Sequence, residues 1–180
     1  MKLTFAAFLF AAVASAQTPP ANPLMATSRA IYNISKGDVM GSVAKVSEEL
    51  WSFQPTPDVR TMGQLFAHIA DGQYEFCGVA LQGQAVDKNI EKTAKTKADV
   101  VAALKDAFAY CDAAYDKLND AKAAETVKFF GMTITRLGAM DFNTAHNMEH
   151  YGNLVTYMRL KGIVPPSSAP RPAAGEKKQE

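Results

Sequence analysis

Three histidines have the residue type and spacing to do chemistry, and they are the only histidines among the 180 residues of this chain. His146 and His150 are four residues apart, so on a helix both rings project from one face with Cβ atoms about 6 Å apart. Two imidazoles at that spacing can bind one metal ion, and His68 can supply the third nitrogen of a reactive site. We therefore predict a divalent metal ion held by His68, His146 and His150. Imidazole suits zinc, nickel and iron alike.

Three neutral imidazoles leave the charge of such an ion undiminished, so Lewis-acid chemistry such as hydrolysis would be available. A general base would then have to lie within hydrogen-bond reach of the reacting group. Asp71 and Glu75 follow His68 by about one and two helical turns, and Glu149 lies between the paired histidines. These three acids are the candidate catalytic residues, although each is also the kind of residue that lies solvated on a helix. We expect Gly72 to leave free volume beside the His68 ring.

Four amphipathic segments must position the histidines. Apolar residues recur at helical spacing in each, and the segments cover residues 31–50, 61–80, 96–118 and 135–161. The sequence thus predicts an all-α protein, a four-helix bundle with a long connection between helices two and three. That connection, residues 82–95, has room for a crossover and carries lysines typical of a solvated segment. Residues 127–134 are the one stretch that could be locally extended.

Capping patterns mark where three of the helices begin or end. Thr61 is followed three residues later by Gln64, and Thr96 by Asp99, as in a capping box. The fourth segment stops at Gly162, which favours a helix terminus. Ile31 and Ile34 belong to the apolar stripe expected on the first helix. In the fourth, the apolar stripe includes Met148, while the histidine side carries polar residues that could line a cleft, namely Asn143, Asn153 and Tyr157.

Two cysteines, Cys77 and Cys111, fall on the apolar stripes of the second and third helices. Spacing alone does not bring their Cα atoms to bridging distance, so we expect buried free thiols in preference to a disulfide. The alternative stays open, because export to an oxidising compartment would permit a bridge.

The two ends of the chain are expected to lie outside the bundle. Residues 1–16 combine Lys2, an apolar run and a small-residue site at Ala16, as in a signal peptide. The mature chain would then begin at Gln17 and work in the periplasm or outside the cell. Residues 17–166 would form the bundle, and residues 167–180 a flexible polar tail. No later segment is apolar enough to span a membrane.

Charge excludes one class of partner. Nineteen basic residues against eighteen acidic ones leave a formal charge of +1, with no basic stripe. Nucleic-acid binding draws on the release of counterions by clustered basic groups. We therefore expect no nucleic-acid partner.

The histidine segments resemble those of a known family. Residues 63–70 (GQLFAHIA) and residues 146–154 (HNMEHYGNL) are similar to the helix-two and helix-four signatures of the DinB-like (damage-inducible) metalloprotein superfamily. The likeness covers residues 24–166. It implies a four-helix bundle with a long second connection, three histidine ligands to zinc, nickel or iron, and often a homodimer. The chain departs from the pattern at Asn153, where many members carry glutamine.

Two functional interpretations follow from this resemblance and from the histidines. The first is an exported divalent-metal-binding protein acting as a metal-dependent hydrolase of an unknown small molecule. The second is a non-catalytic metal- or partner-binding bundle, or a thiol-dependent transferase of the kind found in the superfamily. Export counts against the thiol route, because low-molecular-weight thiols are chiefly cytosolic.

Overall fold

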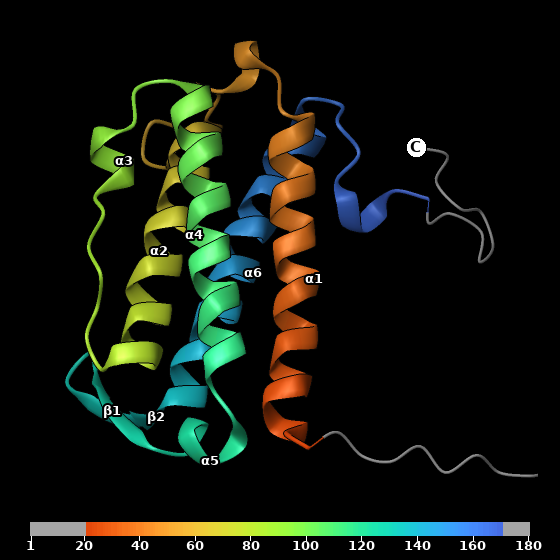
Figure 1. Cartoon of the computed structure of the whole chain (residues 1–180). Coiled ribbons are helices and arrows are strands. Elements are labelled where there is room, and N and C mark those ends of the chain that lie inside the picture. Colours follow the sequence, from red (N-terminus) through yellow and green to blue (C-terminus); the bar gives the residue numbers. More distant parts are fainter. Residues whose placement is uncertain (1–20, 171–180) are drawn as a thin grey trace, which may run out of the picture.

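The computed structural model describes residues 21–170, and four long helices make up most of that part of the chain (Figure 1). The all-α prediction is confirmed. The elements, in order, are α1 (Pro23–Lys45), a 3-10 turn (Glu48–Leu50), α2 (Met62–Gln82), α3 (Ile90–Thr93), α4 (Lys97–Lys117), α5 (Asp120–Ala123), β1 (Thr126–Phe129), β2 (Met132–Thr135), α6 (Arg136–Leu160) and a second 3-10 turn (Pro166–Ser168).

Local side-chain hydrogen bonds set the start of three long helices. Thr61 caps α2 and Thr96 caps α4, each in a complete capping box with the residue three positions on. Thr135 caps α6 by accepting from the Gly138 N–H at 3.0 Å. Gly162 follows α6 with a φ of 72°, a left-handed conformation that glycine adopts without strain. The predicted boundaries of these three helices are therefore confirmed to within a few residues.

The connection between α2 and α4 runs back along the length of the bundle, so these two helices point the same way (Figure 1). Helix α2 makes its most extensive contacts with α4 and α6, and α1 packs mainly on α6. This is the crossover that the long connection predicted. It places α2, which carries His68, beside α6, which carries His146 and His150.

The stripe predicted for the first helix is wrong in part. Ile31 and Ile34 are 53% and 64% exposed, while the buried face of α1 is formed by residues such as Tyr32, Ser35 and Val39. The Ser35 hydroxyl donates to the backbone oxygen of Tyr32 at 2.8 Å, so a small polar residue can face the core without an unpaired group. Helix α1 also ends at Lys45, before the predicted limit of residue 50.

A short hairpin precedes α6. Strands β1 and β2 pair antiparallel, and Phe130 and Gly131, both with positive φ, form the turn between them. The locally extended stretch at residues 127–134 is confirmed.

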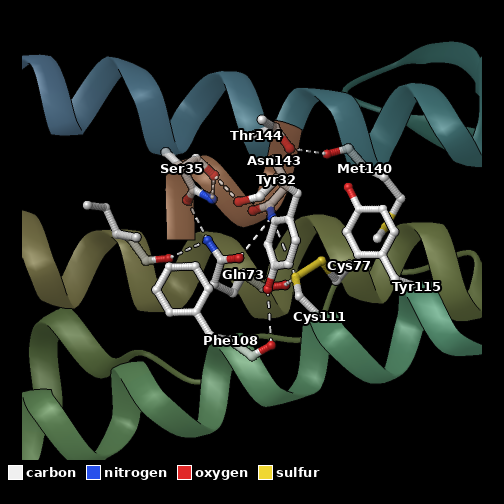
Figure 2. Close-up of a disulfide and its surroundings, with 12 residues drawn as sticks. Tyr32, Ser35, Gln73, Cys77, Phe108, Cys111, Tyr115, Met140, Asn143 and Thr144 are labelled. Atoms are coloured by element: carbon white, nitrogen blue, oxygen red, sulfur yellow. Dashed lines mark hydrogen bonds between the residues drawn. A yellow bond between two sulfur atoms is a disulfide. The ribbon is translucent and has the colours of Figure 1, made fainter. Parts of the chain in front are cut away.

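Cys77 on α2 and Cys111 on α4 form a disulfide, contrary to our expectation of free thiols (Figure 2). Their Cα atoms are 5.4 Å apart, within the range that a bridge requires. The parallel course of α2 and α4 brings the two positions level, which the spacing of the cysteines in the sequence could not reveal.

The predicted tail begins at residue 167, but the first residues of this segment pack on the bundle. Ser167 and Ser168 hydrogen-bond to Tyr151 and Arg159 on α6, so the packed part of the chain extends a little beyond residue 166. The predicted signal peptide at 1–16, and residues 171–180 of the predicted tail, lie outside the described residues. Within residues 21–170, no helix is long and apolar enough to cross a membrane.

Candidate metal centre

The three histidine rings converge between α2 and α6. The Nε2 atom of His146 lies 3.1 Å from Nε2 of His68 and 3.1 Å from Nε2 of His150. The candidate ligand atoms all lie within 4.8 Å of one another. His68 and His146 are half-buried, and His150 is buried. The structure thus brings together the three residues that the sequence singled out.

Burial keeps the three rings neutral. It lowers the pKa of His146 to about 3, with His150 and His68 as further causes, and lowers that of His150 to about 4, with His68 next in importance. The pKa of His68 is lowered as well, first by burial and then by Arg60. Neutral imidazoles have a free lone pair, which a metal ligand needs.

The packing of the nitrogens fits a shared cation. A nitrogen of neutral imidazole is either a donor or an acceptor, so Nε2 of His146 cannot hydrogen-bond to both of its neighbours at once. One ion that accepts all three lone pairs removes this conflict. Nitrogen ligands in a tetrahedral zinc site lie about 3.3 Å apart, close to the 3.1 Å that separates Nε2 of His146 from each of the other two Nε2 atoms. The donor set therefore suits a divalent ion such as zinc, nickel or iron.

Glu91 is the residue at this site that our sequence reasoning missed. Its Oε2 lies 3.2 Å from Nδ1 of His68, and its Oε1 accepts from Nε of Arg60 at 2.8 Å. A carboxylate behind a ligand histidine fixes the tautomer and the orientation of the ring. Glu91 escaped notice because it lies in the connection that we read as solvated. The sequence did contain one signal, the apolar Ile90 beside Glu91 in an otherwise polar segment, and the structure buries Ile90 against the bundle.

The other two rings lack such support among the described residues. Nδ1 of His146 and Nδ1 of His150 are buried and have no hydrogen-bond partner within residues 21–170. Within residues 21–170, Glu91 is the one acid that hydrogen-bonds to a candidate ligand ring, that of His68.

The three candidate catalytic acids have different places in the structure. Asp71 accepts from the backbone N–H groups of Ile90 (2.7 Å) and Glu91 (2.9 Å), so it holds the start of α3. Asp71 and Glu75 line a second hollow beside the connection, which meets the cavity next to His150 at Glu91, and neither acid lines that cavity itself. Only Glu149 lines that cavity. The structure therefore retains Glu149 as the candidate base and assigns Asp71 a positioning role.

A cavity of about 670 Å³ opens beside His150. It lies between α6, the start of α2 and the loop before α2. Asn153 and Tyr157, predicted on the histidine side of α6, both line it. Its volume is in the range of small-molecule sites. Asn143 does not belong to this cavity, because its side chain is buried inside the bundle.

The ring that Gly72 accommodates is that of His146, and not His68 as we expected. A Cβ at Gly72 would lie 2.6 Å from Cε1 of His146, closer than such atoms approach. The absence of a side chain at this position lets the His146 ring approach α2 closely.

Buried polar side chains hold α6 against α2 next to the histidines, and Figure 2 shows three of them, Ser35, Gln73 and Asn143. Gln73 on α2 donates to Oδ1 of Asn147, and Asn143 donates to Oε1 of Gln73 at 2.9 Å. The Asn147 amide also donates to the Ser35 hydroxyl of α1. All four side chains are fully buried. Because Asn147 follows His146 directly, this network sets how the histidine face of α6 meets α2.

Solved structures share this fold. A DinB-like protein (YjoA) from Bacillus subtilis is 20% identical, with a TM-score of 0.63, and the match covers 84% of this chain and all of that one. A DinB-like protein from Bacillus cereus is 15% identical, with a TM-score of 0.63, covering 77% of this chain and 93% of the other. A mycothiol-dependent maleylpyruvate isomerase is 12% identical, with a TM-score of 0.60, covering 72% of this chain and 60% of that enzyme. At these identities the likeness establishes the fold alone.

The sequence itself matches a family. No curated protein matches the chain. A sequence profile of the DinB superfamily, however, matches residues 36–154, which is more than half of the chain and includes all three histidines. This chain therefore belongs to the DinB superfamily.

Proposed function

We propose that this chain is an exported, metal-dependent hydrolase of a small molecule, with zinc, nickel or iron held by His68, His146 and His150. The observation that carries the proposal is the meeting of three Nε2 atoms beside a cavity. DinB-like proteins are often metal-binding, which supports it. A divalent ion bound by neutral imidazoles supplies Lewis acidity to a substrate in the cavity.

The protein side chains around the cavity have separate tasks in this proposal. Glu149 is exposed on the cavity wall next to His150 and is placed to take a proton from the nucleophile. Glu91 orients the His68 ring from behind. The cavity also favours an enzyme, because a substrate needs space beside the metal site. A bundle that only binds a metal ion needs no such space.

Turnover tests the catalytic part of the proposal. Protein loaded with each of the three metals is assayed against ester, amide and phosphoester substrates. Glu149→Gln keeps its metal and loses at least tenfold in kcat, whereas Glu49→Gln, an exposed acid on another element, keeps both. A Glu149→Gln variant with unchanged kcat on an active substrate would remove Glu149 from the mechanism.

Export is supported by the leader-like residues 1–16 and by the Cys77–Cys111 disulfide, a bond typical of oxidising compartments. The test is fractionation of cells expressing the full chain, followed by N-terminal sequencing. A periplasmic or secreted product beginning at Gln17 is expected. A cytosolic product that still begins at Met1 would contradict export.

The thiol-dependent alternative is tested in the same assays. The mycothiol-dependent enzyme that shares the fold requires a low-molecular-weight thiol by its name. Adding such a thiol to the metal-loaded protein leaves hydrolysis unchanged under our proposal. Activity that appears only with the thiol would favour the transferase-like function.

A further inference from the structure

One wall of the cavity beside His150 carries a positively charged side chain, Arg60, most of whose N–H donors have no hydrogen-bond partner within residues 21–170. Arg60, in the loop just before α2, lines this cavity and its side chain is 41% exposed. Its Nε donates to Glu91 at 2.8 Å, and within residues 21–170 the guanidinium makes no other hydrogen bond. A guanidinium offers five N–H donors in a planar fork that matches two oxygens of a carboxylate or phosphate. The edge that bears Nη1 and Nη2 is therefore available to a ligand.

Arg60 is held in place from the histidine side. Glu91 contacts Arg60 through one carboxylate oxygen and His68 through the other. It therefore links the guanidinium to the ring of a candidate metal-binding histidine. The start of α3, which carries Glu91, is fixed in turn by Asp71. A side chain fixed in this way loses less entropy on binding an anion than a free surface arginine would.

The electrostatics of the cavity favour an anion at this position. Arg60 and His150 line the same cavity, and Glu91 links the Arg60 guanidinium to the His68 ring. The positive end of the α2 dipole begins at Met62, two residues after Arg60. A divalent ion on neutral imidazoles adds two further charges of the same sign.

Negative groups in the cavity leave this balance in place. Glu91 is already engaged by Arg60 and His68. Asp58 and Glu149 also line the cavity; both are exposed, as Arg60 is, so water screens all three charges. The two charges that a divalent ion would bring to the histidines are therefore what favours an anion here. Donor groups stand next to Arg60, because Gln64 uses its Oε1 to cap α2 and so has its amide N–H groups available.

We propose that Arg60 binds an oxyanionic group, a carboxylate or phosphate, of the small molecule that occupies the cavity beside the three histidines. The inference rests on the proposed function, since it assigns a substrate class to the same site. It makes Arg60 a binding residue, with Glu91 positioning it.

The test titrates Co²⁺-loaded protein with malonate, with inorganic phosphate and with malonamide, the uncharged counterpart of malonate. The visible absorption of bound Co²⁺ reports that the ion stays in place, and calorimetry reports ligand binding. Wild-type protein binds at least one of the two anions and binds malonamide at least tenfold more weakly. At saturating Co²⁺, Arg60→Gln weakens that anion by about 10- to 100-fold, the loss of one charge-assisted contact.

Two further variants separate the binding role from a structural one. Arg29→Gln removes an arginine–carboxylate pair of almost equal exposure (40%), with Asp116 on α4, and leaves anion affinity unchanged. Glu91→Gln removes the carboxylate behind His68, so Co²⁺ binds more weakly. It also removes the group that positions Arg60, so anion affinity at saturating Co²⁺ falls, but by less than with Arg60→Gln.

The possible failures are distinguishable. Wild-type protein that binds no Co²⁺ overturns the proposed function. Protein that binds Co²⁺ but prefers neither anion to malonamide, or an Arg60→Gln variant that binds anions as tightly as wild type, overturns the role of Arg60 alone.

Discussion

At the scale of single residues, the space beside Gly72 decides where the His146 ring can lie. Gly72→Ala would place a methyl group 2.6 Å from Cε1 of that ring, so the ring must move away from the other two. We expect metal affinity to fall at least tenfold. Alanine favours a helix by about 1 kcal/mol over glycine, which offsets part of the clash in the free energy of unfolding. Competition with a chromophoric chelator measures the affinity.

The matched control is Gly37→Ala on α1, where an added Cβ meets nothing within 4 Å. This variant should gain up to about 1 kcal/mol in the free energy of unfolding and keep its metal affinity. A Gly72→Ala protein with wild-type affinity would show that the His146 ring does not need its present position.

The histidines also show what the sequence could and could not predict at this scale. His146 and His150 share a face because of their spacing, and that much follows from helix geometry alone. His68 was inferred to join them because it is the one remaining histidine and lies on another predicted helix, and the likeness to a known family supported that inference. Glu91 and Arg60 were missed, because they reach the site from α3 and from the loop before α2, and the course of both segments depends on tertiary packing.

At the scale of elements, the pairing of Gln73 with Asn147 fixes α6 against α2. We predict that Asn147→Ala costs about 1–3 kcal/mol in the free energy of unfolding, because it leaves the buried Gln73 amide without its main acceptor. It also lowers metal affinity, because α6 is then free to rotate or slide and the three nitrogens no longer meet. Denaturant unfolding and chelator competition measure the two effects.

Thr144→Val is the control on the same helix. The Thr144 side chain is buried too, but its hydroxyl donates to the Met140 carbonyl of its own helix and has no contact with Gln73 or Asn147 among the hydrogen bonds of residues 21–170. We expect a small stability change and unaltered metal affinity. Should Asn147→Ala lose stability and yet bind metal as tightly as wild type, the network would be structural only.

The helices were predictable where local signals set them. The capping boxes at Thr61 and Thr96 gave the starts of α2 and α4, because they involve residues three apart. The buried face of α1 was predicted correctly at Val39 and Val43 but not at its first turns, since serines that bond to their own helix replace apolar residues in the core there. The disulfide was missed for a third reason, namely that it depends on the parallel course of two helices.

At the scale of the whole molecule, the Cys77–Cys111 bridge closes a loop of 34 residues that includes α3. Replacing both cysteines by serine should lower the free energy of unfolding by about 3–4 kcal/mol, the loop-closure value for that length. Urea unfolding measures the loss. Because the bridge does not contact the histidines, variant protein that stays folded should bind one metal ion as before. Equal stability with and without the bridge would contradict this account.

Single residues, helix packing and the overall fold all place the three imidazoles of α2 and α6 where one divalent ion can bind. Export, the identity of the metal and the homodimer implied by the family resemblance stay predictions. The position of the histidines does not depend on any of them.

Metal analysis of the purified protein tests this claim most directly. Protein isolated from the periplasm without chelators, and analysed by mass spectrometry of its elements, should hold one zinc, nickel or iron ion per chain. His68→Ala, His146→Ala and His150→Ala should each hold almost none while retaining the helical circular dichroism of wild type. A wild-type protein without metal, or a His150→Ala variant with a full equivalent, would contradict the account.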